Sequence, residues 1–154
     1  MDIEKIKDHC LNRTYMSGVD REKNRIRATG EIFTPTSLVE EILDQLSPEL
    51  FTNPTKTFLD PSCGDGQFLV SVLIRKIEAG IDFETALSTI YGVDLMYDNV
   101  NLCRDRLLCG REDLRGIVER NIVCHDSLTY DFSFNGTDGN QEKIIFDEFL
   151  KFDK

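Results

Sequence analysis

Acidic side chains follow three predicted strands of this 154-residue chain, each at the point where the strand ends. Asp60 opens the turn DPSCGDG, Asp94 closes the segment TIYGVDL, and Asp126 follows the segment NIVC. The carboxyl ends of parallel strands meet at one edge of a sheet, so we expect these three carboxylates to lie together. Such an edge favours a cationic ligand and repels a polyphosphate.

The turn at residues 60–66 differs from the glycine motifs that bind phosphate. It has neither the GxGxxG order of the dinucleotide fingerprint nor the GK[ST] ending of a P-loop. Instead it places Asp60 and Asp65 where those motifs keep neutral backbone, while Gly64 and Gly66 allow close backbone approach and positive φ. S-adenosylmethionine, a nucleoside that carries an ammonium and a sulfonium group, suits this turn.

If the ligand is S-adenosylmethionine, Asp94 and Asp126 would contact its nucleoside part. Asp94 would accept hydrogen bonds from both ribose hydroxyls, as acids at that place do in nucleotide-binding folds. Leu95 and Met96 would pack on the adenine, and Asp126 would accept from its amino group. Each acid alone has a structural alternative, because Asp is a common helix N-cap.

Strands and helices alternate along the predicted chain. The expected elements are helix 36–46, strand 55–60, helix 66–79, helix 83–89, strand 89–95, helix 99–110 and a third strand within 116–128 that ends near Cys124. This order predicts βαβ units and a parallel sheet with right-handed crossovers. Residues 130–142 predict a loop, and 143–154 suit either a helical turn or an edge strand.

Two N-terminal segments have weaker patterns. Residues 1–28 predict a short helix and an arm packed on the domain rather than a core element. Thr34 is the expected cap of helix 36–46, and Pro35 suits its first turn. The apolar residues of that helix predict one amphipathic face, and they are Leu38, Val39, Ile42, Leu43 and Leu46.

Composition narrows the function classes. The net charge of −10 repels phosphate backbones, and the basic segment REKNRIR at 21–27 reads either as a local patch or as a solvated helix face. No apolar run approaches a membrane span and the first residues lack a signal-peptide core, so we expect a cytoplasmic protein. The five cysteines form no CxxC pair, which predicts reduced thiols and no metal site.

Four motifs in order resemble the adenine-N6 DNA methyltransferases of restriction–modification systems, especially the modification-subunit type. They are GEIFTPTSLVEEIL, FLDPSCGDGQFLVSVL, IYGVDLMYDNVNLCRDRLL and NIVCHDSL, and they span about residues 28 to 128. The resemblance implies S-adenosylmethionine as cofactor and a phage or bacterial host. It also implies an α/β, Rossmann-like class I methyltransferase fold, with an incomplete parallel sheet and flanking helices.

Site residues carry over from this resemblance motif by motif. The segment 33–35 matches the motif that closes over the methionine end of the cofactor, and 60–66 matches the cofactor loop, with Asp60 near the amino group. Asp94 matches the ribose-binding acid, and Asp126 with Ser127 matches the adenine-contacting pair. The expected cofactor-binding residues are Phe33, Thr34, Pro35, Asp60, Pro61, Ser62, Cys63, Gly64, Gly66, Asp94, Leu95, Asp126 and Ser127.

The catalytic motif of the family has no counterpart here. These enzymes methylate through an Asn/Asp/Ser-Pro-Pro-aromatic motif on a fourth strand, which aligns the target amino group and stacks an extruded base. This sequence has no Pro-Pro pair, so we assign no catalytic residue. We expect an N-terminal helical arm at 1–28 and a cofactor-binding domain at 29–154 that stops before the fourth strand.

This organisation predicts an open sheet edge. In the family the first strand lies between the second and the fourth, so its edge would be unpaired and apolar here. We therefore expect a homodimer, or a partner subunit that covers the edge and brings DNA.

Three functions stay open. The chain is a cofactor-binding part of a split or truncated methylase or a regulator, an enzyme acting on S-adenosylmethionine itself, or a structural protein that has lost the ligand. For the second function, His125 is the plausible imidazole near the site. Retention of Asp60, Gly64 and Asp94 argues against the third function.

Overall fold

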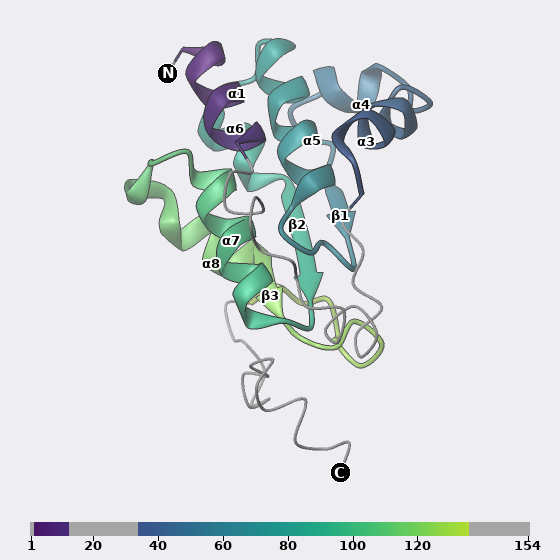
Figure 1. Ribbon diagram of the computed structural model, residues 1–154, viewed down its shortest axis with the longest axis vertical. Helices are drawn as coiled ribbons and strands as arrows, with labels where there is room; N and C mark the ends of the chain where they lie inside the picture. Colours follow the sequence, from purple (N-terminus) through teal and green to yellow (C-terminus); the bar gives the residue numbers. More distant parts are fainter. Residues whose placement is uncertain (1, 13–33, 136–154) are drawn as a thin grey trace.

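The computed structural model describes residues 2–12 and 34–135, which form a small parallel sheet flanked by helices (Figure 1). The helices are α1 (Ile3–Leu11), α3 (Thr36–Leu43), α4 (Glu49–Thr52), α5 (Gln67–Glu78), α6 (Phe83–Ser88), α7 (Tyr97–Leu108), the 3-10 turn η2 (Glu112–Leu114) and α8 (Arg115–Asn121). The strands are β1 (Phe58–Asp60), β2 (Ile90–Asp94) and β3 (Ile122–Cys124). The predictions for Phe33, the basic segment 21–27, the domain boundary at 28 and residues 136–154 lie outside the described residues.

The sheet confirms the predicted parallel α/β arrangement. Its strand order is β1-β2-β3, and both neighbouring pairs are parallel. Asp60 lies opposite Gly92, and Asp94 lies opposite Cys124. Strand β2 thus ends two residues, about 7 Å, beyond β1, whereas β2 and β3 end level.

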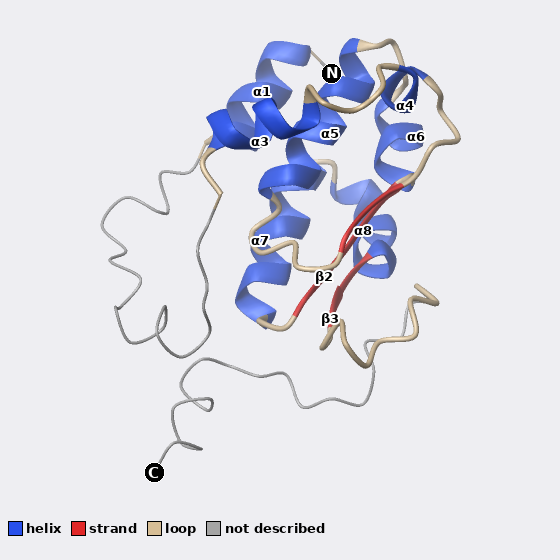
Figure 2. Ribbon diagram, turned by 90° about the vertical axis from the view of Figure 1, so that its right-hand side faces the viewer, coloured by secondary structure: helices blue, strands red, loops and turns tan. Residues whose placement is uncertain are grey.

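Helix α5 is the centre of the main core. It contacts α1, α3, α6 and α7 as well as β1 and β2, and its residues Leu69, Val70 and Leu73 are buried. Figure 2 shows α5 and α7 on one side of the strands. On this side the sheet has Gly92, where an added Cβ would lie 2.8 Å from Leu69 Cδ1. The packing of α5 against β2 therefore depends on the missing side chain.

The other side of the sheet is covered by the segment that follows β3. Val93 and Val123 pack there against the buried Tyr130 and the adjacent Phe134. The Phe134 ring also contacts Tyr91, with ring centroids 4.8 Å apart. Residues 130–134 contain no helix or strand, as predicted for a loop, yet they form a small second core.

The third predicted strand is wrong in its first half. Residues 115–121 form α8, and only Ile122–Cys124 form β3. Helix α8 buries Val118 and Asn121, and the Asn121 amide donates to the Ser88 carbonyl at 3.2 Å. Tertiary contacts of this kind override the strand preference of the isoleucine and valine in the segment.

Helix α3 differs from its prediction in length, cap and buried face. It ends at Leu43 and has Pro35 at the N-cap position with no side-chain cap, so the predicted capping by Thr34 is wrong. Val39 and Leu43 are buried, but the other three predicted face residues, Leu38, Ile42 and Leu46, are exposed. The predicted apolar face is therefore only partly covered by the described residues.

The short N-terminal helix is present as predicted, but it packs into the core instead of lying outside it. Ile6 and Cys10 of α1 are buried in the main core, whereas the sequence predicted an element outside it. Helix α4 was not predicted; its buried Phe51 stacks on Phe58 with ring centroids 5.2 Å apart. No helix of the described residues is long and apolar enough to cross a membrane.

The close approach at Gly92 gives a first prediction. Gly92→Ala should lower the free energy of unfolding by about 1–3 kcal/mol, because the new methyl overpacks against Leu69 and Cys63. Gly116→Ala is the matched control: it has open space around its Cβ and lies in α8, so it should raise stability by about 0.5–1 kcal/mol. Urea unfolding measures both, and equal effects would contradict this packing.

Candidate functional site

The same turn follows all three strands. Asp60, Asp94 and Asp126 each accept a hydrogen bond at Oδ1 from the backbone N–H two residues further along, at 3.0, 2.8 and 2.9 Å. Each carboxylate therefore organises its own turn. The alternative interpretation of these acids as helix N-caps is therefore wrong: α7 has Met96 at its N-cap with no side-chain cap, and no described helix begins at Asp60 or Asp126.

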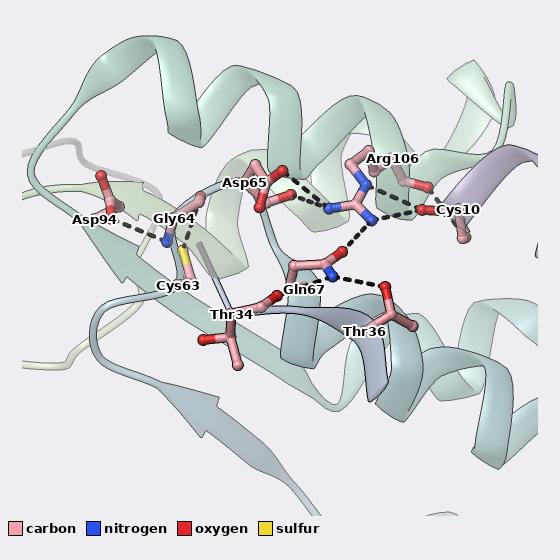
Figure 3. Close-up of polar contacts among 9 residues, drawn as sticks. All are labelled: Cys10, Thr34, Thr36, Cys63, Gly64, Asp65, Gln67, Asp94 and Arg106. Carbon is pink, nitrogen blue, oxygen red and sulfur yellow. Dashed lines mark hydrogen bonds and ion pairs between the residues drawn. The ribbon is translucent and has the colours of Figure 1, made fainter. Parts of the chain in front are cut away.

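Asp94 also joins two loops. Its Oδ2 accepts the Gly64 N–H at 2.9 Å (Figure 3). Its Oδ1 accepts the side-chain amide of Asn99 at 3.3 Å. Beside this contact the Cys63 N–H donates to the Val93 carbonyl at 2.9 Å, which continues the pairing of β1 with β2 into the loop. The structure thus brings the predicted cofactor loop directly against the end of β2.

Two glycines set the path of this loop. Gly64 and Gly66 have φ of 53° and 90°, as the sequence predicted. A Cβ on Gly66 would lie 2.7 Å from Cys103 Sγ, so α7 also packs directly against this backbone. Helix α5 begins immediately after Gly66.

Asp65 points into the protein, so its predicted place on the ligand-facing side of the turn is wrong. Its carboxylate is buried, and its Oδ2 lies 3.4 Å from Nη1 of the buried Arg106. The same Nη1 donates to the Asp65 carbonyl at 2.9 Å. The charge of Asp65 is therefore compensated inside, and Asp60, Asp94 and Asp126 supply the negative charge at the strand ends.

Arg106 links three separate segments of the chain, as Figure 3 shows. Its Nε and Nη2 donate to the Cys10 carbonyl in α1 at 3.0 and 2.6 Å, and Nη2 also donates to Gln67 Oε1 at 2.8 Å. Gln67 Nε2 in turn donates to the Thr34 carbonyl at 3.2 Å and to Thr36 Oγ1 at 3.0 Å. The segment before α3 is thus tied to the loop that the sequence predicted as its partner.

Sequence reasoning missed Arg106 and Gln67. Arginine and glutamine are mostly exposed in proteins, so neither residue type signals burial. The one available signal is spacing, because Arg106 follows the buried Cys103 by three positions on α7. That spacing places both residues on one side of a helix.

The other predicted site residues lie around the same strand ends. Pro61 and Ser62 are exposed on the loop, Cys63 is buried beneath it, and Leu95 and Ser127 are half-buried. Thr34 and Pro35 precede α3, and Pro35 is exposed. His125 Nδ1 lies 2.9 Å from the Asp126 carbonyl, and its ring lies 5.0 Å from that of Tyr130.

Burial raises the pKa of the Asp60 carboxyl, and the hydrogen bond from Ser62 offsets this only in part. A cation bound beside Asp60 would favour its ionised form. Within residues 2–12 and 34–135, no group of three His, Cys, Asp or Glu side chains is placed to hold a metal ion.

The buried ion pair gives a second prediction. Arg106→Met should lower the free energy of unfolding by about 3–5 kcal/mol, since it removes the guanidinium that lies 3.4 Å from the buried Asp65 carboxylate. Adding Asp65→Asn should recover part of that loss. Arg104→Met is the matched control, because the buried Arg104 donates to the Ile122 and Glu119 carbonyls; its effect should add to that of Asp65→Asn. In a double-mutant cycle of unfolding free energies, additive effects of Arg106→Met and Asp65→Asn would contradict the pairing.

Comparison with known proteins agrees with the motifs at this site. The chain resembles the Type II methyltransferase M.VspI of Vibrio sp. (strain 343), with 29% identity over 100 residues, which cover 65% of this chain and 21% of that protein. It thus spans about a fifth of the length of this relative. No solved structure matches the chain. The family model for N-6 DNA methylases matches residues 16–145, so the chain belongs to the N-6 DNA methylase family.

Proposed function

We propose that this chain binds S-adenosylmethionine as the cofactor-binding part of an adenine-N6 DNA methyltransferase, in a Rossmann-like class I fold. Members of the N-6 DNA methylase family generally use this cofactor. The observation that carries the proposal is the set of three strand-end carboxylates. Among the described residues, Asp60 and Asp126 each use one oxygen in a turn and present a second oxygen with no protein donor.

The donor set fits a cationic nucleoside. Asp60 would hold the ammonium group, because a bound cation offsets the burial of its carboxylate. Asp126 and Ser127 would contact the adenine amino group, and Leu95 would pack on the ring. These assignments use the second carboxylate oxygen of Asp60 and of Asp126, because the first oxygen of each accepts a hydrogen bond within its turn.

Asp94 has a different main role from the one the sequence suggested. Both of its oxygens already accept hydrogen bonds from the protein, from Gly64, Met96 and Asn99. We therefore assign it first to holding the loop at Gly64, and its contact with the ribose stays as the family resemblance implies. The loop residues Pro61, Ser62, Cys63, Gly64 and Gly66 would line the cofactor with backbone.

The segment before α3 would close over the methionine end of the cofactor. Gln67 donates to the Thr34 carbonyl in this segment and to the hydroxyl of Thr36, the first residue of α3, beside the cofactor loop. Phe33 and Pro35 flank Thr34 in the sequence. The buried Arg106–Gln67 contact would keep this segment and the loop in register.

Methyl transfer is assigned to a partner rather than to the residues of this chain. The sequence lacks the Asn/Asp-Pro-Pro-aromatic motif, and its net charge of −10 opposes binding to a phosphate backbone. DNA would therefore be reached through another subunit of a restriction–modification methylase. A regulator that binds the cofactor is the other form of the same proposal.

The open side of β1 supports association. The Phe58 N–H donates to Thr89 beside β2, so by alternation the N–H and C=O of Leu59 point away from the sheet. Beside them runs an apolar groove of about 300 Å³ whose lining includes Ile42, Leu46 and Phe68. Leu59 itself is 49% exposed. A strand of another subunit would find both backbone partners and apolar surface here.

Cofactor binding tests the proposal and gives a third prediction. Isothermal titration calorimetry of the full chain with S-adenosylmethionine should show binding, and Asp60→Asn should weaken it by about 1.5–3 kcal/mol, or about 10- to 150-fold. Asn can keep the hydrogen bond from Ser62, so the change mainly removes charge. Asp82→Asn is the matched control: Asp82 also accepts a backbone N–H, that of Thr85 at the N-cap of α6, and its change should leave the affinity unaltered.

Each other outcome separates the alternatives. No heat of binding by the wild-type chain would refute the proposal and favour a structural protein of the same fold. Methylthioadenosine or homoserine lactone in the calorimeter cell after the titration would refute the proposal and favour an enzyme that cleaves the cofactor. Equal losses for Asp60→Asn and Asp82→Asn would remove Asp60 from the site.

The open edge gives a fourth prediction. Without a partner subunit, the chain should form a dimer in gel filtration with light scattering, because Leu59 and the groove are exposed. Leu59→Lys should shift the measured mass to that of a monomer, since it places a charge on the edge. Leu128→Lys, at a residue that is 92% exposed and not part of the groove lining, should leave the dimer intact. A stable wild-type monomer would contradict this use of the edge.

A further inference from the structure

Two thiols from distant parts of the chain lie side by side at the junction of α1 and α7. The Sγ atoms of Cys10 and Cys109 are 3.2 Å apart, although the residues are 99 positions apart in sequence. Cys10 is fully buried and Cys109 is half-buried. Both sulfur atoms also lie 3.4 Å from the Arg106 carbonyl, so one acceptor holds the pair together.

The two thiols differ in ionisation. The hydrogen bond between the sulfur atoms lowers the pKa of Cys109 and raises the pKa of Cys10. Cys109 is therefore the thiol that ionises first, and it is also the more accessible of the two. A thiolate rather than a thiol is the nucleophile in cysteine oxidation.

Helix α1 is already held where a bond between the two sulfur atoms needs it. Arg106 donates twice to the Cys10 carbonyl, Lys7 pairs with Glu78 at 2.6 Å, and His9 Nε2 lies 3.1 Å from the Asp105 carbonyl. Ile6, on the same helix, is buried in the main core. The sulfur atoms therefore need to approach by only about 1.2 Å to form a bond.

We propose that Cys10 and Cys109 are a modification site, which a hydroperoxide converts to a reversible disulfide. This inference rests on the thiol geometry and not on the proposed function. The disulfide would join α1 to α7, which carries Arg106, and Arg106 in turn contacts Asp65 of the cofactor loop and Gln67 of α5. The bond would close a covalent loop around most of the described core.

The steps balance with the peroxide as the only oxidant. With hydrogen peroxide, the Cys109 thiolate attacks one peroxide oxygen, an S–O bond forms, the O–O bond breaks, and the departing oxygen leaves as water after taking a proton; an organic hydroperoxide would release an alcohol at this step. Cys10 then attacks Cys109 Sγ, an S–S bond forms, the S–O bond breaks, and the proton of Cys10 leaves with the hydroxyl group as a second water. Two thiols lose two electrons, and an external dithiol restores them by exchange.

The remaining cysteines serve as internal controls. Cys63 and Cys103 are both buried, at 5% and 0% exposure, so a peroxide has no direct access to them. Cys124 is half-buried, and its thiol donates to the Leu95 carbonyl at 3.4 Å. Cys63 also hydrogen-bonds to Cys103. Both thiols of that pair are buried, whereas Cys109 is half-buried, so accessibility selects the Cys10–Cys109 pair.

The test gives a fifth prediction. The full chain is treated with hydrogen peroxide, its remaining thiols are alkylated, and the digest is mapped by mass spectrometry without reduction. We expect one cross-link, Cys10 to Cys109, a loss of two free thiols, and full reversal by dithiothreitol. The melting temperature should rise on oxidation by about 10 °C, because the bond closes a loop of about 100 residues.

Variants make the result specific. Cys124→Ser should leave the cross-link unchanged, whereas Cys109→Ser should abolish both the cross-link and the rise in melting temperature. A cross-link to any other cysteine, a disulfide between two chains, or no loss of thiols would overturn the proposal. Cys10→Ser should leave Cys109 as a sulfenic acid that a dimedone probe captures, and failure of capture would also count against it.

Discussion

The hydrogen bond from the Gly64 N–H to Asp94 is the contact on which the candidate site depends. It fixes the loop after β1 to the end of β2, and the neighbouring bond from Cys63 to Val93 extends the sheet into that loop. The other oxygen of Asp94 accepts the Met96 N–H in the turn after β2, so one carboxylate sets the conformation of the loops after β1 and β2. This residue thus ties the loop after β1 to the end of β2 as one surface.

A second charged group holds the loop from the inside. Arg106 compensates Asp65 beneath the loop, so the carboxylates that remain at the strand ends are those that follow the three strands. The same guanidinium reaches α1 through the Cys10 carbonyl and the segment before α3 through Gln67. The loop is therefore fixed between a carboxylate outside and a guanidinium inside, and elements far apart in sequence share one network.

The sequence predicted the parallel sheet, the three acids and the two positive-φ glycines, because hydrophobic runs, strand ends and turns have local signals. It did not predict Arg106, since a buried arginine depends on partners that come from α1 and the loop after β1. It placed a strand at 116–121, where contacts of Val118 and Asn121 produce a helix. It also expected the apolar residues Ile42 and Leu46 to be covered, whereas they line the groove beside β1. Local patterns identify surfaces that need a partner, but they do not identify the partner.

The most direct measurement is a titration of the ¹⁵N-labelled chain with S-adenosylmethionine, followed by amide chemical shifts. Ser62, Gly64, Met96 and Leu128 donate their amides to the three strand-end acids, so they report on each carboxylate separately. The account predicts saturable shifts at all four, with smaller changes at Thr85, whose amide donates to the distant Asp82. Saturation without shifts at these amides, or no shifts at all, would contradict the claim that the three acids form one cofactor site.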